Sequence, residues 1–306
     1  MKTCILFPGQ GAQSIGMGKD LYDQSADVRH MFEEASDVSR IDLPALIFSG
    51  TEEDLKQTRN TQVALALVDS AAALVLRSRG IVAQGTAGFS LGEWAAMTEA
   101  AVIPFGQMIR LVAERGRLMD EAGKRSGGSS MTAVLGLDPA SIEAAIRNAG
   151  IEDAWIANYN APAQSVLSGT ELGLSKAEDA VKAAGAKRAI RLKVSGAFHS
   201  PIMRYAYDGF REFLADVVFK DPSISFYSNV TGATVSSGAE IKKLAAEQII
   251  SPVRWMDEEQ AMLADQYERM LEAGPGTVLA GLWKSTGSSL PIIPAGTLEQ
   301  IDAVLS

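Results

Sequence analysis

Cysteine is nearly absent from this chain, because Cys4 is the single one among 306 residues. One thiol excludes an internal disulfide and any metal site built from several cysteines. Since Cys4 lies in the apolar stretch TCILF, we expect it to be buried in a strand and chemically inert.

Positive charge is also scarce. The sequence has 28 Lys and Arg residues against 37 Asp and Glu residues, which gives a formal net charge of -9. This balance argues against broad nucleic-acid binding. An acidic partner would therefore need a local basic patch on this chain.

Long hydrophobic runs are missing as well. The most apolar stretch, residues 63–76, is too short for a membrane span and contains Asp69 and Ser70, so we expect a buried helix there. Near the N-terminus, Pro8 and Gly9 interrupt the apolar run before a secretory signal could form. We therefore expect a cytoplasmic protein without membrane contacts. We also expect a monomer.

Residues 130–194 form a block with its own order of elements. Alternating and apolar runs predict strands at 132–137, 154–159, 165–169 and 188–194. Asp138 and Pro139 open a helix between the first two strands, and a turn with Asn160 and Pro162 joins the middle two. A second helix is predicted from the capping-box pattern Ser175…Glu178.

This order, strand, helix, strand, strand, helix, strand, is typical of a ferredoxin-like unit. The remaining residues, 1–129 and 195–306, alternate helices with buried strands such as CILFP, ISFYSN and PIIPAG. That alternation predicts an α/β domain with a mostly parallel sheet and helices on both faces. The sequence thus predicts a discontinuous α/β domain (1–129 and 195–306) with a small inserted domain (130–194).

A serine framed by glycines, Gly88-Phe89-Ser90-Leu91-Gly92, follows the weakly predicted strand AQGTAGF. In a nucleophile elbow, such glycines allow a tight strand-to-helix turn that exposes the serine hydroxyl. The pattern alone is weak, because serine is also a favoured N-cap residue. Ser90 is therefore either a nucleophile or the cap of an alanine-rich helix.

A nucleophilic serine needs a base, and the chain has two histidines. His30 lies in a charged amphipathic stretch, which indicates a solvated surface position. His199 lies in KVSGAFHSP, just after the strand that closes the inserted block. If a histidine activates Ser90, it is His199; otherwise His199 is a hydrogen-bonded loop residue.

The stretch LFPGQGAQSIGMG places Gly9 and Gly11 between a strand and a helix. A dinucleotide fingerprint needs a third glycine where Ser14 stands, so that interpretation is disfavoured. The same loop could direct a backbone N–H of Gln10 at a developing oxyanion, with a second donor from Leu91.

Arg115 falls on the apolar face of a helix predicted from Phe105 to Met119. A buried guanidinium needs a carboxylate, either from an internal Asp or Glu or from a substrate. The pattern alone favours the internal partner, because structural ion pairs outnumber ligand sites.

Eight blocks spread along nearly the whole chain match one known family in order. They are FPGQGAQ at 7–13, TQVALA at 61–66, GFSLGEWAA at 88–96, ERGRLM at 114–119, NYNAPAQSVLSG at 158–169, SGAFHSPIM at 195–203, SPVRW at 251–255 and EAGPGTVLAGL at 272–282.

These blocks resemble the malonyl-CoA:acyl carrier protein transacylases of fatty acid and polyketide synthesis. The resemblance implies a hydrolase-like α/β domain with a ferredoxin-like insert. It also implies that Ser90 forms the acyl-enzyme, that His199 is its base, and that the main-chain carbonyl of Gln248 orients His199. By the same resemblance, Gln10 and Leu91 match the oxyanion donors.

The substrate residues follow from the same resemblance. Arg115, in the block that also holds Met119, matches the arginine that binds the free carboxylate of the malonyl group, which favours a substrate partner over an internal one. Gln62 and Asn160 match polar residues of the active-site cleft. Phe198 matches a bulky position that accompanies malonyl rather than methylmalonyl units.

The implied reaction is a ping-pong transfer in which malonyl-CoA acylates serine and the pantetheine thiol of an acyl carrier protein then accepts the malonyl group. CoA and phosphopantetheine thioesters are substrates, and no metal or redox cofactor is required. Carrier proteins of this pathway are typically acidic, so a basic patch should dock them. The candidates are Lys182, Lys187, Arg188, Arg191 and Lys193, which could equally form a solvated charged face.

One position departs from the family pattern, since Phe89 stands where histidine usually precedes the serine. The nucleophile and base remain, so we expect activity to survive with an altered rate, side hydrolysis or acyl preference. Two alternatives stay open: a serine acyl-thioester hydrolase, including a patatin-like enzyme using Asp208, and an inactive carrier-docking subunit.

Overall fold

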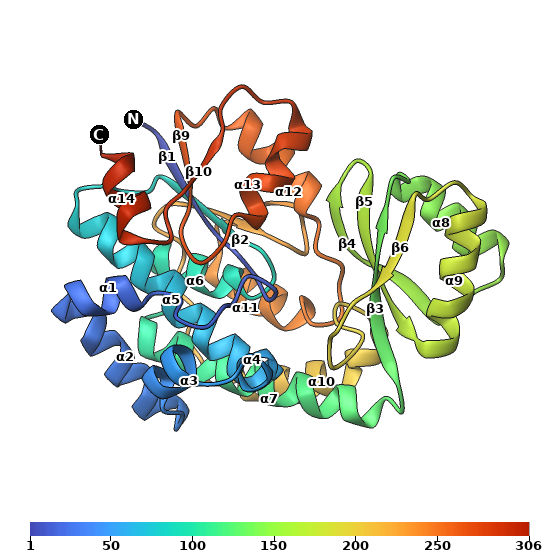
Figure 1. Ribbon diagram of the computed structural model, residues 1–306, viewed down its shortest axis with the longest axis horizontal. Helices are drawn as coiled ribbons and strands as arrows, with labels where there is room; N and C mark the ends of the chain where they lie inside the picture. The colour runs from blue at the N-terminus through green and yellow to red at the C-terminus, as the bar shows by residue number, and fades with distance from the viewer. Residues whose placement is uncertain (306) are drawn as a thin grey trace.

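Two β-sheets organise the chain in the computed structural model, which describes residues 1–305, and Figure 1 shows the smaller sheet to one side of the larger. The larger sheet is parallel from β10 to β7, and β8 pairs antiparallel with β7. Its strands, in spatial order, are β10 (Ile292–Pro294), β9 (Arg269–Glu272), β1 (Thr3–Phe7), β2 (Gly85–Gly88), β7 (Ser225–Ser228) and β8 (Ala233–Thr234).

The central strand β1 has the sequence TCILF and is buried along its whole length. Ile5 and Phe7 contribute to one apolar core, whereas Cys4 and Leu6 contribute to a second. Because successive side chains of a strand point to opposite faces, the two cores lie on the two faces of the sheet. The predicted α/β class with helices on both faces is therefore confirmed, as is the burial of Cys4.

The helices divide unequally between the two faces. The core around Ile5 and Phe7 takes buried side chains from α1 (Lys19–Gln24), α2 (Ala26–Ser39), α3 (Leu43–Ser49), α4 (Glu52–Lys56), α5 (Thr58–Ser78), α6 (Gly92–Glu99), α7 (Phe105–Arg125), α10 (Arg204–Phe213), α11 (Gly238–Glu247) and α14 (Leu298–Val304). The core around Cys4 and Leu6 takes them from α12 (Trp255–Ala264) and α13 (Val278–Trp283).

Helix α5 is the buried helix expected at residues 63–76, but it extends over 21 residues. It is long and apolar enough to cross a membrane by length and composition, yet 83% of its most apolar window is buried inside the protein. Its side chains from Val63 to Ala72 are buried in the core shared with α6 and α7. The burial explains the apolar composition, since a core helix is hydrophobic on all sides.

The smaller sheet is antiparallel and is built from residues 129–191, close to the predicted block. Its spatial order is β4 (Ala154–Ala161), β5 (Gln164–Thr170), β3 (Ser129–Leu135) and β6 (Arg188–Arg191). Helices α8 (Pro139–Asn148) and α9 (Glu171–Ala183) give it an apolar core of its own, which includes Val134, Ile142 and Leu174. The elements follow one another in the predicted order.

Three local predictions in this block were wrong. Helix α9 begins at Glu171, because the side chain of Thr170 accepts a hydrogen bond from the Gly173 N–H, and Ser175 lies inside the helix. Asn160 belongs to β4 rather than to the turn, since irregular register near Tyr159 lets that strand continue to Ala161. Strand β6 ends at Arg191, after which the chain turns toward the site.

The two sheets are joined next to the segment that carries His199. An isolated parallel bridge links Asn158 of β4 to Val253, which precedes α12. The Ser168 hydroxyl of β5 donates to the Phe198 carbonyl. The loop with Phe198 and His199 is therefore fixed against the smaller sheet while its other side faces β2.

Replacement of Gly88 by alanine is expected to destabilise the protein by about 2–4 kcal/mol, because the new Cβ would lie 2.0 Å from the carbonyl carbon of Gly92. Gly281→Ala, where a Cβ would meet nothing within 4 Å inside α13, is the matched control and should stabilise by about 0.5–1 kcal/mol. Urea denaturation measures both free energies. Equal stabilities of the two variants would contradict this account of the turn.

Candidate functional site

Ser90 lies in the turn between β2 and α6 with a left-handed backbone, φ 51°. The residues two positions before and after it must be glycines, because a Cβ on Gly88 would overlap Gly92 and a Cβ on Gly92 would lie 2.1 Å from the Phe7 carbonyl oxygen. The N-cap of α6 is Leu91, without a side-chain cap. Ser90 is thus held in a nucleophile elbow and is not a helix cap.

His199 faces this serine from the loop that follows β6. Its Nε2 lies 2.8 Å from Ser90 Oγ, and its Nδ1 lies 2.8 Å from the main-chain oxygen of Gln248. A carbonyl only accepts, so Nδ1 carries the proton and Nε2 is free to accept the serine proton. His199 also has a left-handed backbone, φ 57°, as Ser90 does.

Burial sets the protonation state of this histidine. Burial, with a smaller contribution from the nearby Arg115 charge, lowers the pKa of His199 from 6.5 to about 4. The imidazole is consequently neutral at pH 7. A neutral imidazole hydrogen-bonded to a serine hydroxyl is suited to general-base catalysis.

Arg115 is completely buried in α7 beside the serine. Its Nη1 donates to Gln62 Oε1 at 2.6 Å, and its Nη2 donates to Gln248 Oε1 at 2.8 Å and to Ser90 Oγ at 3.3 Å. Within residues 1–305 it forms no ion pair, and its Nε has no partner, so the internal salt bridge favoured by the helix pattern alone is absent. Burial lowers the pKa of Arg115 to about 10, although the negative charge of Glu93 acts to raise it. Arg115 is therefore charged at pH 7.

A cavity of about 260 Å³ opens in front of Ser90 and His199. Five of the other predicted residues line it: Gln10, Gln62, Met119, Asn160 and Phe198. Arg115, Leu91 and Gln248 lie behind this lining, in contact with or adjacent to Ser90. The structure thus brings all ten predicted site residues to one place.

The glycine loop after β1 packs against the elbow. A Cβ on Gly9 would lie 2.3 Å from the Phe89 carbonyl oxygen, so the missing side chain serves this contact rather than a phosphate group. The main-chain N–H groups of Gln10 and Leu91 have no acceptor among residues 1–305. Two free N–H groups beside a nucleophile are the requirement for an oxyanion hole.

Sequence reasoning missed several residues around the serine. Asn158 and Gln164 line the cavity, and Asn229 and Glu93 lie behind the elbow, fully buried. The Ser90 N–H donates to Asn229 Oδ1 at 2.7 Å. A signal was available for Asn229, since it follows the strand FYS in a sheet whose carboxyl ends are the usual place for sites.

Asp208 and His30, the alternatives to His199 as partner of Ser90, lie away from the serine. Asp208 is on α10, where it accepts a hydrogen bond from Arg204, and Ser90 pairs with His199 instead. His30 is exposed and contacts Glu33, as predicted for a surface histidine. A Ser–Asp dyad using Asp208 is therefore not formed.

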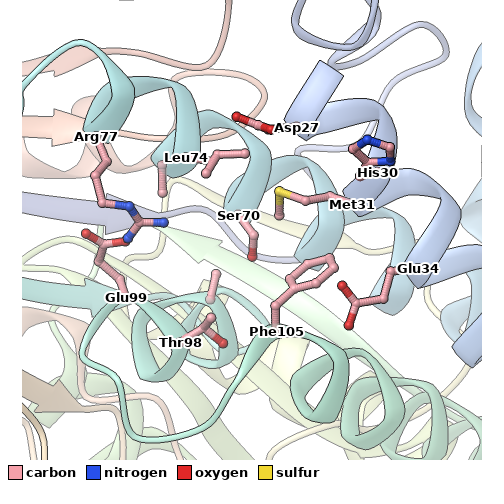
Figure 2. Close-up of a pocket in the computed structure, with 12 residues that line it drawn as sticks. Asp27, His30, Met31, Glu34, Ser70, Leu74, Arg77, Thr98, Glu99 and Phe105 are labelled. Carbon is pink, nitrogen blue, oxygen red and sulfur yellow. The ribbon is translucent and has the colours of Figure 1, made fainter. Parts of the chain in front are cut away.

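Figure 2 shows a second pocket, of about 310 Å³, between α2, α5, α6 and α7. Arg77 reaches Glu99 across it at 3.2 Å. Its one serine, Ser70, donates to the Ala66 carbonyl within α5. This pocket therefore offers no serine paired with a base, and the cavity at Ser90 is the candidate active site.

Comparisons with known proteins agree with this geometry. The family model described as "Acyl transferase domain" matches residues 4–301. Among curated relatives, the malonyl CoA-acyl carrier protein transacylase of Bacillus subtilis is 37% identical over 99% of this chain and 96% of that protein. The enzyme of the same name from Staphylococcus aureus is 32% identical over 98% of this chain and 97% of that protein.

Solved structures with a similar fold are also malonyl transferases. An acyl carrier protein S-malonyltransferase from Vibrio cholerae superposes with a TM-score of 0.95 at 38% identity, over 99% of this chain and 100% of the other. A malonyl-transacylase in complex with its type II PKS acyl-carrier protein superposes with a TM-score of 0.95 at 36% identity, over 100% and 99%. By sequence, fold and site, this chain belongs to the acyl transferase domain family.

Proposed function

We propose that this chain transfers a malonyl group from malonyl-CoA to the pantetheine thiol of an acyl carrier protein, in fatty acid or polyketide synthesis. The observation that carries the proposal is a buried, unpaired guanidinium, that of Arg115, 3.3 Å from the hydroxyl of a serine whose base is in place. Only an acyl group that ends in a carboxylate would complete that arrangement.

In the acylation step, Ser90 Oγ attacks the thioester carbon while His199 Nε2 takes the hydroxyl proton. The N–H groups of Leu91 and Gln10 stabilise the oxyanion. The C–S bond then breaks, His199 returns its proton to the CoA sulfur, and malonyl-Ser90 remains. The main-chain oxygen of Gln248 holds the imidazole by its Nδ1–H during both proton transfers.

Arg115 selects the acyl group in this scheme. Gln62 and Gln248 hold its guanidinium with neutral oxygen atoms and leave it without a direct carboxylate partner. A malonyl carboxylate supplies that partner, whereas an acetyl group does not. Met119, Asn160 and Phe198 shape the cavity around the acyl chain.

The second half-reaction reverses the first with a different thiol. His199 takes the proton of the pantetheine thiol, and the sulfur attacks the ester carbon of malonyl-Ser90. The ester C–O bond then breaks, and His199 returns the proton to Ser90 Oγ. The complex of a similar transacylase with its carrier protein supports an acyl carrier protein as the acceptor.

We further propose that residues 130–194 are a ferredoxin-like subdomain inserted into a hydrolase-like domain made of 1–129 and 195–306, and that the protein acts in the cytoplasm. The strand order β4-β5-β3-β6 supports the subdomain assignment. Carrier docking is assigned to the exposed Lys182, Lys187, Arg188 and Lys193. Arg191 contributes less, because it pairs with two glutamates, at 2.6 and 2.8 Å.

Incubation with malonyl-CoA should give a covalent malonyl adduct in intact mass spectra, and Ser90→Ala should abolish it. Arg115→Ala should slow malonyl adduct formation about 100-fold or more while acetyl-CoA becomes comparable, because the charge that recognises the carboxylate is gone. Arg117→Ala is the matched control on the same helix, since that guanidinium pairs with Glu114 and Glu121 at the surface.

Two outcomes would contradict the proposal. Malonyl-CoA cleavage without an adduct on Ser90, with CoA and free malonate as products, would favour the acyl-thioester hydrolase. Complete inertness of the folded protein would favour the carrier-docking subunit.

The acylation rate should stay constant as the pH falls from 8 to about 5 and should drop only near pH 4. The reason is that His199 accepts a proton only when neutral, and burial lowers its pKa to about 4, so the base is lost below that pH. Single-turnover acylation at each pH, with near-ultraviolet circular dichroism to verify folding, measures this. A midpoint at 6.5, the ordinary histidine value, would show that the imidazole is not desolvated.

The double reversal Lys187→Glu with Arg188→Glu should reduce the second-order rate of transfer to the carrier about tenfold, with a weaker effect in high salt. The rate of acylation by malonyl-CoA should not change, because both side chains are exposed outside the cavity. The control with the same charge change is Lys19→Glu with Lys56→Glu, on α1 and α4. Equal losses in both half-reactions would reject the docking role.

A further inference from the structure

The Asn229 side chain supports the backbone of the nucleophile elbow from behind. Its Oδ1 accepts the Ser90 N–H at 2.7 Å, and its Nδ2 donates to the Gly88 carbonyl at 2.8 Å. One amide therefore spans the turn from the end of β2 to the serine. Because Ser90 N–H can only donate and Gly88 C=O can only accept, these partners fix the orientation of the amide.

The Asn229 side chain takes the place of strand pairing at the point where β2 and β7 no longer pair. Strands β2 and β7 pair in parallel at Gly85↔Ser225 and Thr86↔Phe226. Beyond these residues β2 pairs with β1 alone and then enters the elbow after Gly88. Asn229 follows the end of β7, and its side chain supplies the donor and the acceptor that a neighbouring strand would have supplied. Buried backbone groups at the elbow are thus satisfied where the ladder ends.

Asn229 is itself held from two further helices. Its main-chain N–H donates to Glu93 Oε2 of α6 at 3.0 Å, and its Nδ2 also donates to Glu258 Oε1 of α12 at 2.7 Å. Gln248 Nε2 donates to the same Glu93 oxygen at 2.7 Å and to the Ser90 carbonyl at 3.0 Å. All four side chains are at most 1% exposed.

The elbow needs such support because its conformation is unfavourable. A serine at φ 51° lies in the left-handed region, which costs on the order of 1 kcal/mol for a residue with a Cβ. Rotation of this peptide would move Ser90 Oγ away from His199 and would turn the Leu91 N–H away from the oxyanion position. Geometry off by about 1 Å can cost about 100-fold in rate.

We propose that Asn229 is a positioning residue for the acyl transfer: its side-chain amide, held by Glu93 and Glu258, keeps Ser90 in the left-handed conformation that presents Oγ to His199. The inference rests on the proposed acylation of Ser90. Asn229 touches no reacting atom and acts through the backbone on either side of the nucleophile. Its removal should therefore lower the rate of the chemical step while leaving the binding of malonyl-CoA nearly unchanged.

The test is single-turnover acylation by malonyl-CoA, followed by intact mass spectrometry over a range of substrate concentrations. Asn229→Ala should lower the saturating acylation rate about 100-fold and change the half-saturating concentration less than threefold, because Arg115 and the cavity lining remain. The wild-type protein is measured alongside. If it forms no adduct, the proposed function fails, and the Asn229 variants are then compared by the reactivity of Ser90 toward a serine-directed fluorophosphonate.

A matched control separates positioning from stability. Tyr227→Phe removes hydrogen bonds to Asp265 and Tyr267 two residues before Asn229, in the preceding strand β7, without touching the elbow. It should lower the melting temperature and leave the acylation rate within about twofold. An Asn229→Ala rate that falls no further than the Tyr227→Phe rate would overturn the proposal.

The isosteric variant Asn229→Asp provides a second readout, which also serves if the alanine variant does not fold. Its Oδ1 can still accept the Ser90 N–H, but only a protonated Asp can donate to Gly88. The groups that face it are Glu93, whose pKa burial raises to about 7, Glu258, whose pKa burial raises well above its ordinary range, and Arg115 through Gln248.

The acylation rate of Asn229→Asp should therefore rise as the pH falls from 9 to 6, whereas the wild-type rate stays constant. A variant as slow at pH 6 as at pH 9 would overturn the proposal, because donation to the elbow would then make no difference.

Discussion

The site is built around one buried positive charge that the protein does not neutralise. Arg115 is fully buried among amide oxygens, and its nearest acidic influence, Glu93, contacts it only through Gln248. An isolated charge in a protein interior is costly, and hydrogen bonds to neutral oxygens offset only part of the cost. The rest is recovered when an anion enters, so the same arrangement that lowers stability provides selectivity for an acyl group with a carboxylate.

The charge also acts on the base. Arg115 and His199 both contact Ser90 Oγ, and the proximity of the guanidinium adds to the effect of burial in keeping the imidazole neutral. A histidine ready to accept a proton at pH 7 therefore needs no aspartate partner. A neutral carbonyl, that of Gln248, is sufficient to fix its tautomer. An aspartate in that place would instead raise the histidine pKa and would compete with the substrate for Arg115.

How far sequence alone predicts this site depends on the kind of signal. Ser90 and Arg115 could be found from local sequence. Ser90 stands between two glycines in the pattern of a nucleophile elbow, and Arg115 places a charge on the apolar face of a helix. The strands and helices of the smaller sheet followed from apolar periodicity, but the start of α9 did not. Thr170 and Ser175 are both acceptable caps, and only the position of β5 beside α9 decides between them.

Asn229 shows why other residues escape such an analysis. Its position just after a buried strand could mark it as a site residue, but it is 139 positions from Ser90. No local pattern shows that its amide bonds to the elbow where the pairing of β2 with β7 ends. Gln248 is a partial case: the family resemblance identified its backbone as the group that orients His199, but nothing in the sequence indicated that its side chain contacts Arg115, Glu93 and the Ser90 carbonyl. The contacts of Asn229 and Gln248 with the elbow depend on the strand order β1-β2-β7, which brings segments distant in sequence together at the carboxyl ends of these parallel strands.

The elbow and the histidine loop share a further property, which links the fold to the reaction. Ser90 and His199 are both non-glycine residues in the left-handed region, at φ 51° and 57°, on separate segments. Such conformations persist only where the surroundings over-determine them. Here the surroundings are the Gly88 and Gly92 contacts on one side and the smaller sheet, through Ser168 and Phe198, on the other. His199 is also held by the main-chain oxygens of Gln248 and Ile249. The 2.8 Å contact between Ser90 and His199 therefore depends on how these segments are joined, and the bridge between Asn158 and Val253 ties the smaller sheet to the chain just after Ile249.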